Sequence, residues 1–274
     1  KKNICFRGEE IVTGAEVLSP GELINMGAMG MLALVGDARP TVYARPRVAI
    51  ISTGSELVSV EEELSPGKIR NSNSYMIAAQ VRAAGGEPVI CGATKDDVDE
   101  IIAKVNSCKP YDMCVTTGGA SVGDHDLIEE VWRKIGVDVL FTRVSMKPGM
   151  PVVAGLRAGV PHIGLSGNPA AAAMAFEQLL RPVVLKMCGR KDLWRPRVRA
   201  KLSSDFCKKG GSIRFVWANF WQGSDGLLAE PLSLQGNGML SSAITANAII
   251  VVPPDSPPLA KGSEVEVMLL LDRL

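Results

Sequence analysis

The stretch VTTGGASVGDHD, residues 115–126, has residue types and spacing that could hold a phosphate group. A glycine-rich loop between a strand and a helix lets backbone N–H groups and the helix dipole face an anion. The spacing excludes a dinucleotide fingerprint, because Ala120 stands where that motif needs glycine. It also excludes a P-loop, because Asp124 and His125 stand where that motif needs Lys and Ser. A glycine turn with Asp124 or Asp126 as a helix cap is the competing interpretation.

Acidic side chains follow the other predicted strands at matching places. Glu56 lies in the TGSE loop after the first strand, Asp96 and Asp97 lie in the TKDD loop after the second, and Asp126 follows the third. Because the carboxyl ends of parallel strands meet at one edge of a sheet, we expect these carboxylates to converge there. Carboxylates beside a phosphate site suit Mg²⁺. For any single one, a solvated loop carboxylate or a helix cap is the alternative.

Two further loops have residues suited to binding. MKPGMP (146–151) places Lys147 before a Pro-Gly turn, where it acts either as a point charge on a phosphate or as an ordinary surface lysine. GLSGNPAAAAMAF (164–176) predicts a strand, a tight turn and a helix with Pro169 in its first turn, and Asn168 either caps that helix or touches a ligand. The candidate ligand-binding residues of the glycine-rich loop and of this turn are Thr117, Gly118, Gly119, Ser121, Gly123, Ser166, Gly167, Asn168 and Pro169.

Alternating strands and helices must position these loops. Apolar strand patterns alternate with helical patterns, one beginning at Asn73 or Ser74, another at Asp96, and a long one covering about 169–187. This alternation predicts a three-layer, mostly parallel α/β sheet. Short strand-like pieces between Gly and Pro turns then predict a small all-β barrel. The expected division is a remnant of an N-terminal region (1–45), the α/β domain (46–190) and the β-barrel-like domain (191–274).

Composition limits the partners and the compartment. The formal charge of +1 on 274 residues gives no global attraction to nucleic acid or to a membrane surface. The longest apolar stretches are shorter than the roughly 18 residues that a membrane span needs, and the N-terminus does not resemble a signal peptide. The six cysteines show no C-x-x-C spacing, so we expect Cys91 and Cys114 to be reduced and the location to be cytoplasmic. The two histidines do not have zinc-ligand spacing.

Taken together, the motifs resemble the molybdopterin molybdenumtransferases, the MoeA-like enzymes that include the E domain of gephyrin. The opening NICFRGEEI (3–11) is similar to the NIRxxGEDI stretch of that family. The other motifs that carry the resemblance, in family order and at family spacing, are STGSEL (52–57), TKDD (94–97), TTGGASVGDHD (116–126), MKPGMP (146–151), GLSGNP (164–169) and QGNGMLSS (235–242).

The resemblance implies a reaction, cofactors and an assembly. Adenylylated molybdopterin and molybdate would give molybdenum cofactor and AMP with the help of Mg²⁺. The α/β domain would have the molybdopterin-binding fold, and the protein would be a homodimer in which the β domain of one subunit approaches the site of the other. By position in the motifs, Asp126, Glu56, Lys147 and Asp96 would be catalytic, with Asp126 and Glu56 also at the metal.

The sequence departs from the family pattern at four positions. Met150 stands where the family has Lys or Arg, Ser166 where it has Pro, Ser212 where it has Arg, and Asn237 near a position with Ser or another small residue. Lost cations would weaken the hold on molybdate or phosphate. The lobe that precedes the NIRxxGEDI stretch in relatives is also absent from this sequence. Two alternatives follow: a catalytically weak molybdopterin-binding or scaffold relative, and an enzyme of the molybdopterin adenylyltransferase type, which needs only the α/β domain.

Overall fold

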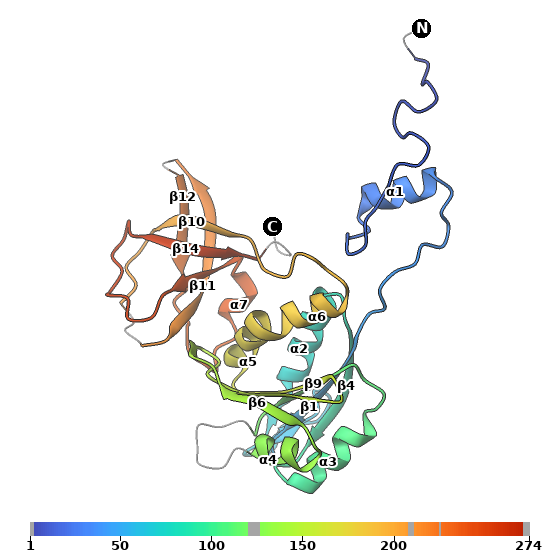
Figure 1. Ribbon diagram of the computed structural model, residues 1–274. Helices are drawn as coiled ribbons and strands as arrows, with labels where there is room; N and C mark the ends of the chain where they lie inside the picture. The colour runs from blue at the N-terminus through green and yellow to red at the C-terminus, as the bar shows by residue number, and fades with distance from the viewer. Residues whose placement is uncertain (1–2, 120–126, 208–210, 225, 271–274) are drawn as a thin grey trace.

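The computed structural model describes residues 3–119, 127–207, 211–224 and 226–270, and it contains an α/β unit, a β barrel and an N-terminal arm (Figure 1). The α/β unit has a six-stranded sheet in the order β4-β1-β5-β9-β8-β6. The first four strands in this order run parallel, whereas β8 is antiparallel to β9 and β6 is antiparallel to β8. The strands are β1 (Arg47–Thr53), β4 (Glu87–Thr94), β5 (Met113–Thr117), β6 (Asp138–Arg143), β8 (Pro151–Arg157) and β9 (Val160–Leu165).

Helices cover both faces of this sheet. On one face lie α2 (Ser72–Ala83), α5 (Pro169–Ala175), the π-helix η1 (Phe176–Leu180) and α6 (Arg181–Met187), and on the other lie α3 (Val98–Ser107) and α4 (Leu127–Lys134). Strand β1 is buried on both sides, since Ile50 packs with Ile77 in one core cluster and Ile51 packs with Ile101 in the other. The predicted three-layer, mostly parallel sheet is therefore confirmed.

Helix starts differ by a residue or two from the prediction. Helix α2 has Asn71 as its N-cap, and the Asn71 side chain accepts a hydrogen bond from the backbone N–H of Ser74, so neither Asn73 nor Ser74 is the cap. Helix α3 begins after Asp97, which accepts from the N–H of Glu100. The predicted helix over 169–187 is present, with the π-helical turn η1 in its middle.

The C-terminal strands form the predicted barrel. Pairings run β12-β10-β14-β13-β11, and β11 also pairs with β12, which closes the ring. The barrel strands are β10 (Arg197–Leu202), β11 (Ile213–Gly223), β12 (Gly226–Pro231), β13 (Ala248–Val252) and β14 (Glu264–Leu269), with the short helix α7 (Ser242–Thr245) before β13. A two-residue strand from the α/β unit, β7 (Met146–Lys147), adds to this sheet in parallel with β11, so one loop belongs to both units.

The N-terminal arm extends away from the barrel and touches the α/β unit just after α6, since a Cβ at Gly21 would lie 2.6 Å from the Gly189 carbonyl oxygen (Figure 1). Its helix α1 (Met26–Leu34) buries only Ala28 and Leu32 among its nine residues, whereas Met26 is 93% exposed.

A small parallel pair of strands, β2 (Leu57–Val58) with β3 (Ile69–Arg70), follows β1. Within the part of the chain that the structure describes, no helix is long and apolar enough to cross a membrane.

The cysteines only partly follow the prediction. Cys91 on β4 and Cys108 at the end of α3 form a disulfide, so the expectation of a reduced Cys91 is wrong. Cys114 on β5 is a free, fully buried thiol, and burial raises its pKa to about 12 because the thiolate would lose its hydration. Cys114 is therefore neutral and takes part in packing.

Candidate functional site

The carboxyl ends of β1, β5 and β9 meet at one edge of the sheet, which we call the carboxyl edge. Gly118 and Gly119 follow β5 with φ of +102° and +66°. A Cβ at Gly118 would overlap the carbonyl oxygen of Thr53, and one at Gly119 would lie 3.0 Å from Thr53 Oγ1. The N–H of Gly118 donates to the Leu165 carbonyl at 3.1 Å. Glycine is therefore needed at both positions for the three strand ends to come together.

Asn73 joins the two predicted ligand loops. From the first turn of α2, its Nδ2 donates to Thr117 Oγ1 and to the Gly167 carbonyl, each at 2.8 Å. Thr117 Oγ1 in turn donates to the Ser166 carbonyl at 3.2 Å. The structure thus brings together three candidate ligand-binding residues, Thr117, Ser166 and Gly167, and their binding role stays a prediction.

The sequence interpretation missed this role of Asn73. Asn73 is 8% exposed and lies four and eight residues before Ile77 and Val81, on the buried stripe of α2. A polar side chain on such a stripe needs a buried partner. That spacing is the signal that could have identified it.

The TGSE and TKDD loops are neighbours at the carboxyl edge, but their acidic side chains do not all face one site. Gly54 N–H donates to the Thr94 carbonyl at 3.0 Å, so the TGSE and TKDD loops are neighbours as predicted. The exposed Glu56 folds its carboxylate back over Gly54, since a Cβ there would lie 2.8 Å from Glu56 Oε1. Asp96 is exposed, whereas Asp97 serves as the cap of α3.

The predicted metal ligands are described only in part. Asp126, Ser121 and Gly123 lie outside the described residues. Over the described ranges no three His, Cys, Asp or Glu side chains gather closely enough to hold a metal ion. Glu56 at the carboxyl edge suits Mg²⁺ bound through one or two carboxylates with substrate phosphates and water. The hydroxyl of Thr53 beside it is buried with no hydrogen-bond partner among the described residues.

The start of α5 is occupied by the barrel. Asn168 holds the N-cap position but its side chain makes no capping hydrogen bond, so the cap interpretation of Asn168 is wrong. Instead the backbone carbonyl of Asn237 accepts from Ala170 N–H at 3.0 Å and from Ala171 N–H at 3.3 Å. The N–H groups of Ala170 and Ala171 are therefore already used, while Asn168 N–H donates to Ser166 Oγ at 3.3 Å.

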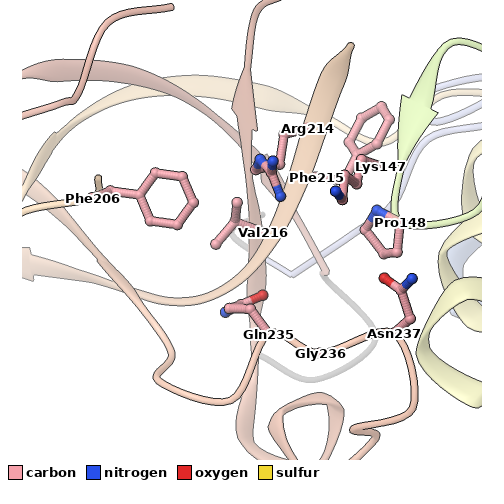
Figure 2. A pocket seen from close by; sticks show the side chains of 9 residues that line it. All are labelled: Lys147, Pro148, Phe206, Arg214, Phe215, Val216, Gln235, Gly236 and Asn237. Carbon is pink, nitrogen blue, oxygen red and sulfur yellow. The ribbon is translucent and has the colours of Figure 1, made fainter. Parts of the chain in front are cut away.

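A pocket of about 390 Å³ lies where β7 meets the barrel, and we call it the cationic pocket (Figure 2). Lys147 and Arg214 are partners in the parallel register of β7 with β11, and both line it. Among the described residues that line it, none is acidic. The lining residues are Lys147, Pro148, Phe206, Arg214, Phe215, Val216, Gln235, Gly236 and Asn237.

The cationic pocket adjoins the carboxyl edge through α5. Asn237 lines the pocket with its side chain and binds the start of α5 with its carbonyl. From the other side, a Cβ at Gly149, which follows Lys147 and Pro148, would lie 3.0 Å from the Ala171 carbonyl. In this chain the barrel thus approaches the α/β unit of the same chain. The approach of a partner's barrel stays a prediction.

Two family descriptions match the chain. "Probable molybdopterin binding domain" matches residues 49–186, and "MoeA C-terminal region (domain IV)" matches residues 199–270. A molybdopterin molybdenumtransferase of Staphylococcus aureus (strain Mu50) is 38% identical over 269 residues, which are 98% of this chain and 64% of the relative. The enzyme of the same name from Bacillus subtilis (strain 168) is 36% identical over 98% of this chain and 63% of its own length.

Solved structures agree with these matches. A molybdopterin biosynthesis MoeA protein from Pyrococcus horikoshii superposes with a TM-score of 0.83 at 29% identity, covering 96% of this chain and 64% of that one. A molybdenum cofactor biosynthesis protein from Pyrococcus furiosus gives a TM-score of 0.74 at 26% identity, covering 96% and 82%. The chain thus spans less than two thirds of the length of the curated relatives described above.

Proposed function

Because the chain belongs to the MoeA-like family of molybdopterin molybdenumtransferases, we propose that it transfers molybdenum from molybdate into adenylylated molybdopterin with release of AMP. The observation that carries this proposal is the adjacency of two anion-binding features. A carboxyl edge with closely packed glycine loops leads into the start of α5, and the cationic pocket, whose lining includes Asn237, adjoins the same helix start. The proposed substrate has anionic phosphates and its co-substrate is an oxyanion, so the two features match its two ends.

Each group has a role in this proposal. The backbone around Thr117, Gly119 and Gly167 holds the pterin phosphate, since glycine lets main-chain N–H groups approach an anion closely, while Gly118, whose N–H already donates to the Leu165 carbonyl, forms the turn. Glu56, with Asp126, would hold Mg²⁺, which when bound supplies positive charge to the phosphates. Lys147 stabilises negative charge on the departing AMP and on the oxyanion.

The remaining candidates have supporting roles. Asp96, exposed in the neighbouring TKDD loop, would add negative charge near a bound Mg²⁺. Ser121 and Gly123 lie outside the described residues and stay candidates from their motif alone. Ser166, Asn168 and Pro169 shape the second loop, in which the Ser166 hydroxyl already accepts a hydrogen bond from Asn168 N–H.

The assembly is part of the same proposal. The arm exposes apolar side chains that a globular chain normally buries, such as Met26, Met29 and Leu34, at 93%, 61% and 61% exposed. A second copy of the chain covering this surface would give the homodimer that the family resemblance implies. The compartment proposed for this biosynthetic step is the cytoplasm.

One assay tests the function. Purified protein is incubated with adenylylated molybdopterin and Mg²⁺, with and without molybdate, and AMP release is followed. Release that depends on molybdate and falls in Lys147→Gln supports the proposal. Tight pterin binding without release would instead identify the scaffold relative. Adenylylation of free molybdopterin from ATP would identify an adenylyltransferase.

A further inference from the structure

We propose that Cys91 and Cys108 form a reversible dithiol–disulfide pair, a redox switch that sets how firmly the TKDD loop and α3 are held at the carboxyl edge. The inference goes beyond the proposed function, because it concerns the regulation of a loop and not the transfer itself. It rests on two cysteines that lie outside all the motifs that carry the family resemblance.

The disulfide closes a ring that contains the TKDD loop. Cys91 lies on β4 and Cys108 follows α3, 17 residues later, with their Cα atoms 6.1 Å apart. The chain between them comprises the end of β4, the TKDD loop and all of α3. A cross-link removes open conformations of the ring that it closes. The TKDD loop is therefore less free in the oxidised chain than in the reduced one.

An irregularity of β4 turns Cys91 toward α3. The register of β1 with β4 slips by one residue here, so that Cys91 and Gly92 together lie opposite Ile51. A bulge of this kind re-aims the side chain at which it occurs. Cys91 packs against the core cluster that contains Ile101 and Val105 of α3. The strand thus presents its sulfur to the helix.

The pair is accessible to a small thiol. Cys91 and Cys108 are half-buried, whereas the free thiol Cys114 is fully buried. Strand β4 is also the last strand at its end of the sheet, so no further described strand covers it. In the cytoplasm, the compartment proposed above, disulfides are usually transient and act in catalysis or redox sensing.

Other contacts keep α3 in place when the cross-link opens. Ile101 and Val105 are fully buried between the helix and the sheet. Asp97 caps the start of the helix and accepts from Glu100 N–H at 2.9 Å. None of these contacts involves a sulfur atom. Reduction should therefore loosen α3 without unfolding it, as a reversible switch requires.

The loosened segment is joined to the second acidic loop. Gly54 N–H in the TGSE loop donates to the carbonyl of Thr94 at 3.0 Å, and Thr94 lies inside the ring. Glu56 lies two residues beyond Gly54. A change in the order of the ring thus reaches the loop that contains Glu56. That this alters substrate binding is the one step that rests on the proposed function.

The redox step balances with a thiol–disulfide couple of the glutathione class. A thiolate of the small molecule attacks one sulfur of the pair, the Cys91–Cys108 bond breaks, and a mixed disulfide forms. A second small thiolate then displaces the first, which leaves two protein thiols and one small-molecule disulfide. Two electrons and two protons have passed to the protein. The reverse sequence restores the cross-link.

The first measurement is a count of free thiols in protein purified without reductant and then denatured. We expect four thiols among the six cysteines, and six after the folded protein has been treated with dithiothreitol. Oxidised glutathione should restore the count of four. Peptide mapping should assign the missing two thiols to Cys91 and Cys108.

The second measurement is the melting temperature of each redox state. Reduction should lower it by roughly 6–12 °C, the effect of opening a ring of this size in a chain of this length. Cys108→Ser should melt like the reduced wild type and show no further response to dithiothreitol. The matched control is Cys207→Ser, which removes an exposed free thiol and should keep the full response.

Hydrogen exchange then locates the change. In the reduced chain the amides of Gly54, Glu100 and Ile101 should exchange about 10-fold faster or more, because their acceptors lie in the ring. The amide of Leu202, which donates to the Ser263 carbonyl in the barrel, should exchange at the same rate in both states. Affinity for adenylylated molybdopterin should fall about 5-fold or more on reduction in wild type and stay constant in Cys108→Ser.

Three results would overturn the inference: six thiols without reductant, a pair that dithiothreitol does not reduce in the folded protein, or equal exchange rates in both states. None of them depends on catalysis. A chain whose ring loosens on reduction but that releases no AMP in either state keeps the switch and loses the proposed transfer. A chain that releases AMP with six free thiols does the opposite.

Discussion

Replacing Asn73 with alanine should loosen the carboxyl edge without disrupting the sheet. The side chain is 8% exposed and donates two hydrogen bonds of 2.8 Å, to Thr117 Oγ1 and to the Gly167 carbonyl. Thr117 Oγ1 keeps its bond to the Ser166 carbonyl, and Gly167 is exposed to water, so neither group is left unsatisfied. At about 1 kcal/mol per bond we expect a loss of about 1–2 kcal/mol. This corresponds to roughly 2–8 °C in melting temperature, measured by scanning calorimetry.

The matched control is Asn71→Ala, two residues earlier on α2. Asn71 is equally buried and also engaged, accepting from Ser74 N–H and from Ser52 Oγ, but it contacts neither ligand loop. We expect a similar loss of stability from the lost cap, about 1–2 kcal/mol. Affinity for adenylylated molybdopterin should fall about 10-fold in Asn73→Ala, the equivalent of about 1.4 kcal/mol, and stay unchanged in Asn71→Ala. Equal affinities in the two variants would refute the positioning role of Asn73.

Three other predictions concern stability. Gly118→Ala should destabilise by about 2–3 kcal/mol, because φ is +102° and the added Cβ would overlap a carbonyl of β1, whereas Gly136→Ala, with φ of +81° and open space, should cost only about 1 kcal/mol in urea unfolding. Glu177→Gln should cost about 1.5–3 kcal/mol, because it removes the charge that holds Arg195 at 2.8 Å, with both side chains less than 10% exposed. Burial lowers the pKa of His162 below 6.5, so the unfolded chain binds its proton more readily. The contribution of neutral His162 to stability should be complete above pH 6.5 and lost as the pH falls below it, a dependence that should be absent in His162→Gln.

Each of these has an outcome that would contradict it. Equal losses in Gly118→Ala and Gly136→Ala would show that the close approach to β1 is relieved by a small shift. If Glu177→Gln left the free energy of unfolding unchanged, the ion pair would not be what holds the segment before the barrel onto η1. If the stability of wild type and of His162→Gln changed in the same way between pH 5 and 7, the loss of stability at low pH would come from other groups.

Much of the fold could be predicted because apolar patterns are long and regular. The β-branched run RVAIIST predicts a strand, and it forms β1, which is buried between two helical layers. Helix starts were less accurate, because Asp96 and Asp97 are neighbours of the same type and only the backbone geometry decides which one caps α3. The disulfide of Cys91 with Cys108 could not be foreseen, since it depends on how the end of α3 packs against β4.

The candidate site shows the same difference between local patterns, which the sequence reveals, and contacts between distant segments, which it does not. Thr117, Gly118 and Gly167, which local motifs gave as candidate binding residues, lie at one edge because glycine loops follow strands in a regular way. Contacts between distant segments were missed. The sequence offered Asn168 either as the cap of α5 or as a ligand contact, and the carbonyl of Asn237, far along the chain, accepts the hydrogen bonds that a cap would accept.

The two basic residues of the cationic pocket come from different units of the fold, Lys147 from the loop of the α/β unit and Arg214 from the barrel. The resemblance predicted lost cations at Met150 and Ser212 and hence a weak hold on an oxyanion. In the structure the register of β7 with β11 pairs Lys147 with Arg214, two residues beyond Ser212. A shift of two residues along a strand keeps a side chain on the same face, and a long arginine side chain can span the distance. The charge of the pocket is therefore set by strand register, and a family pattern aligned one residue at a time does not reveal it.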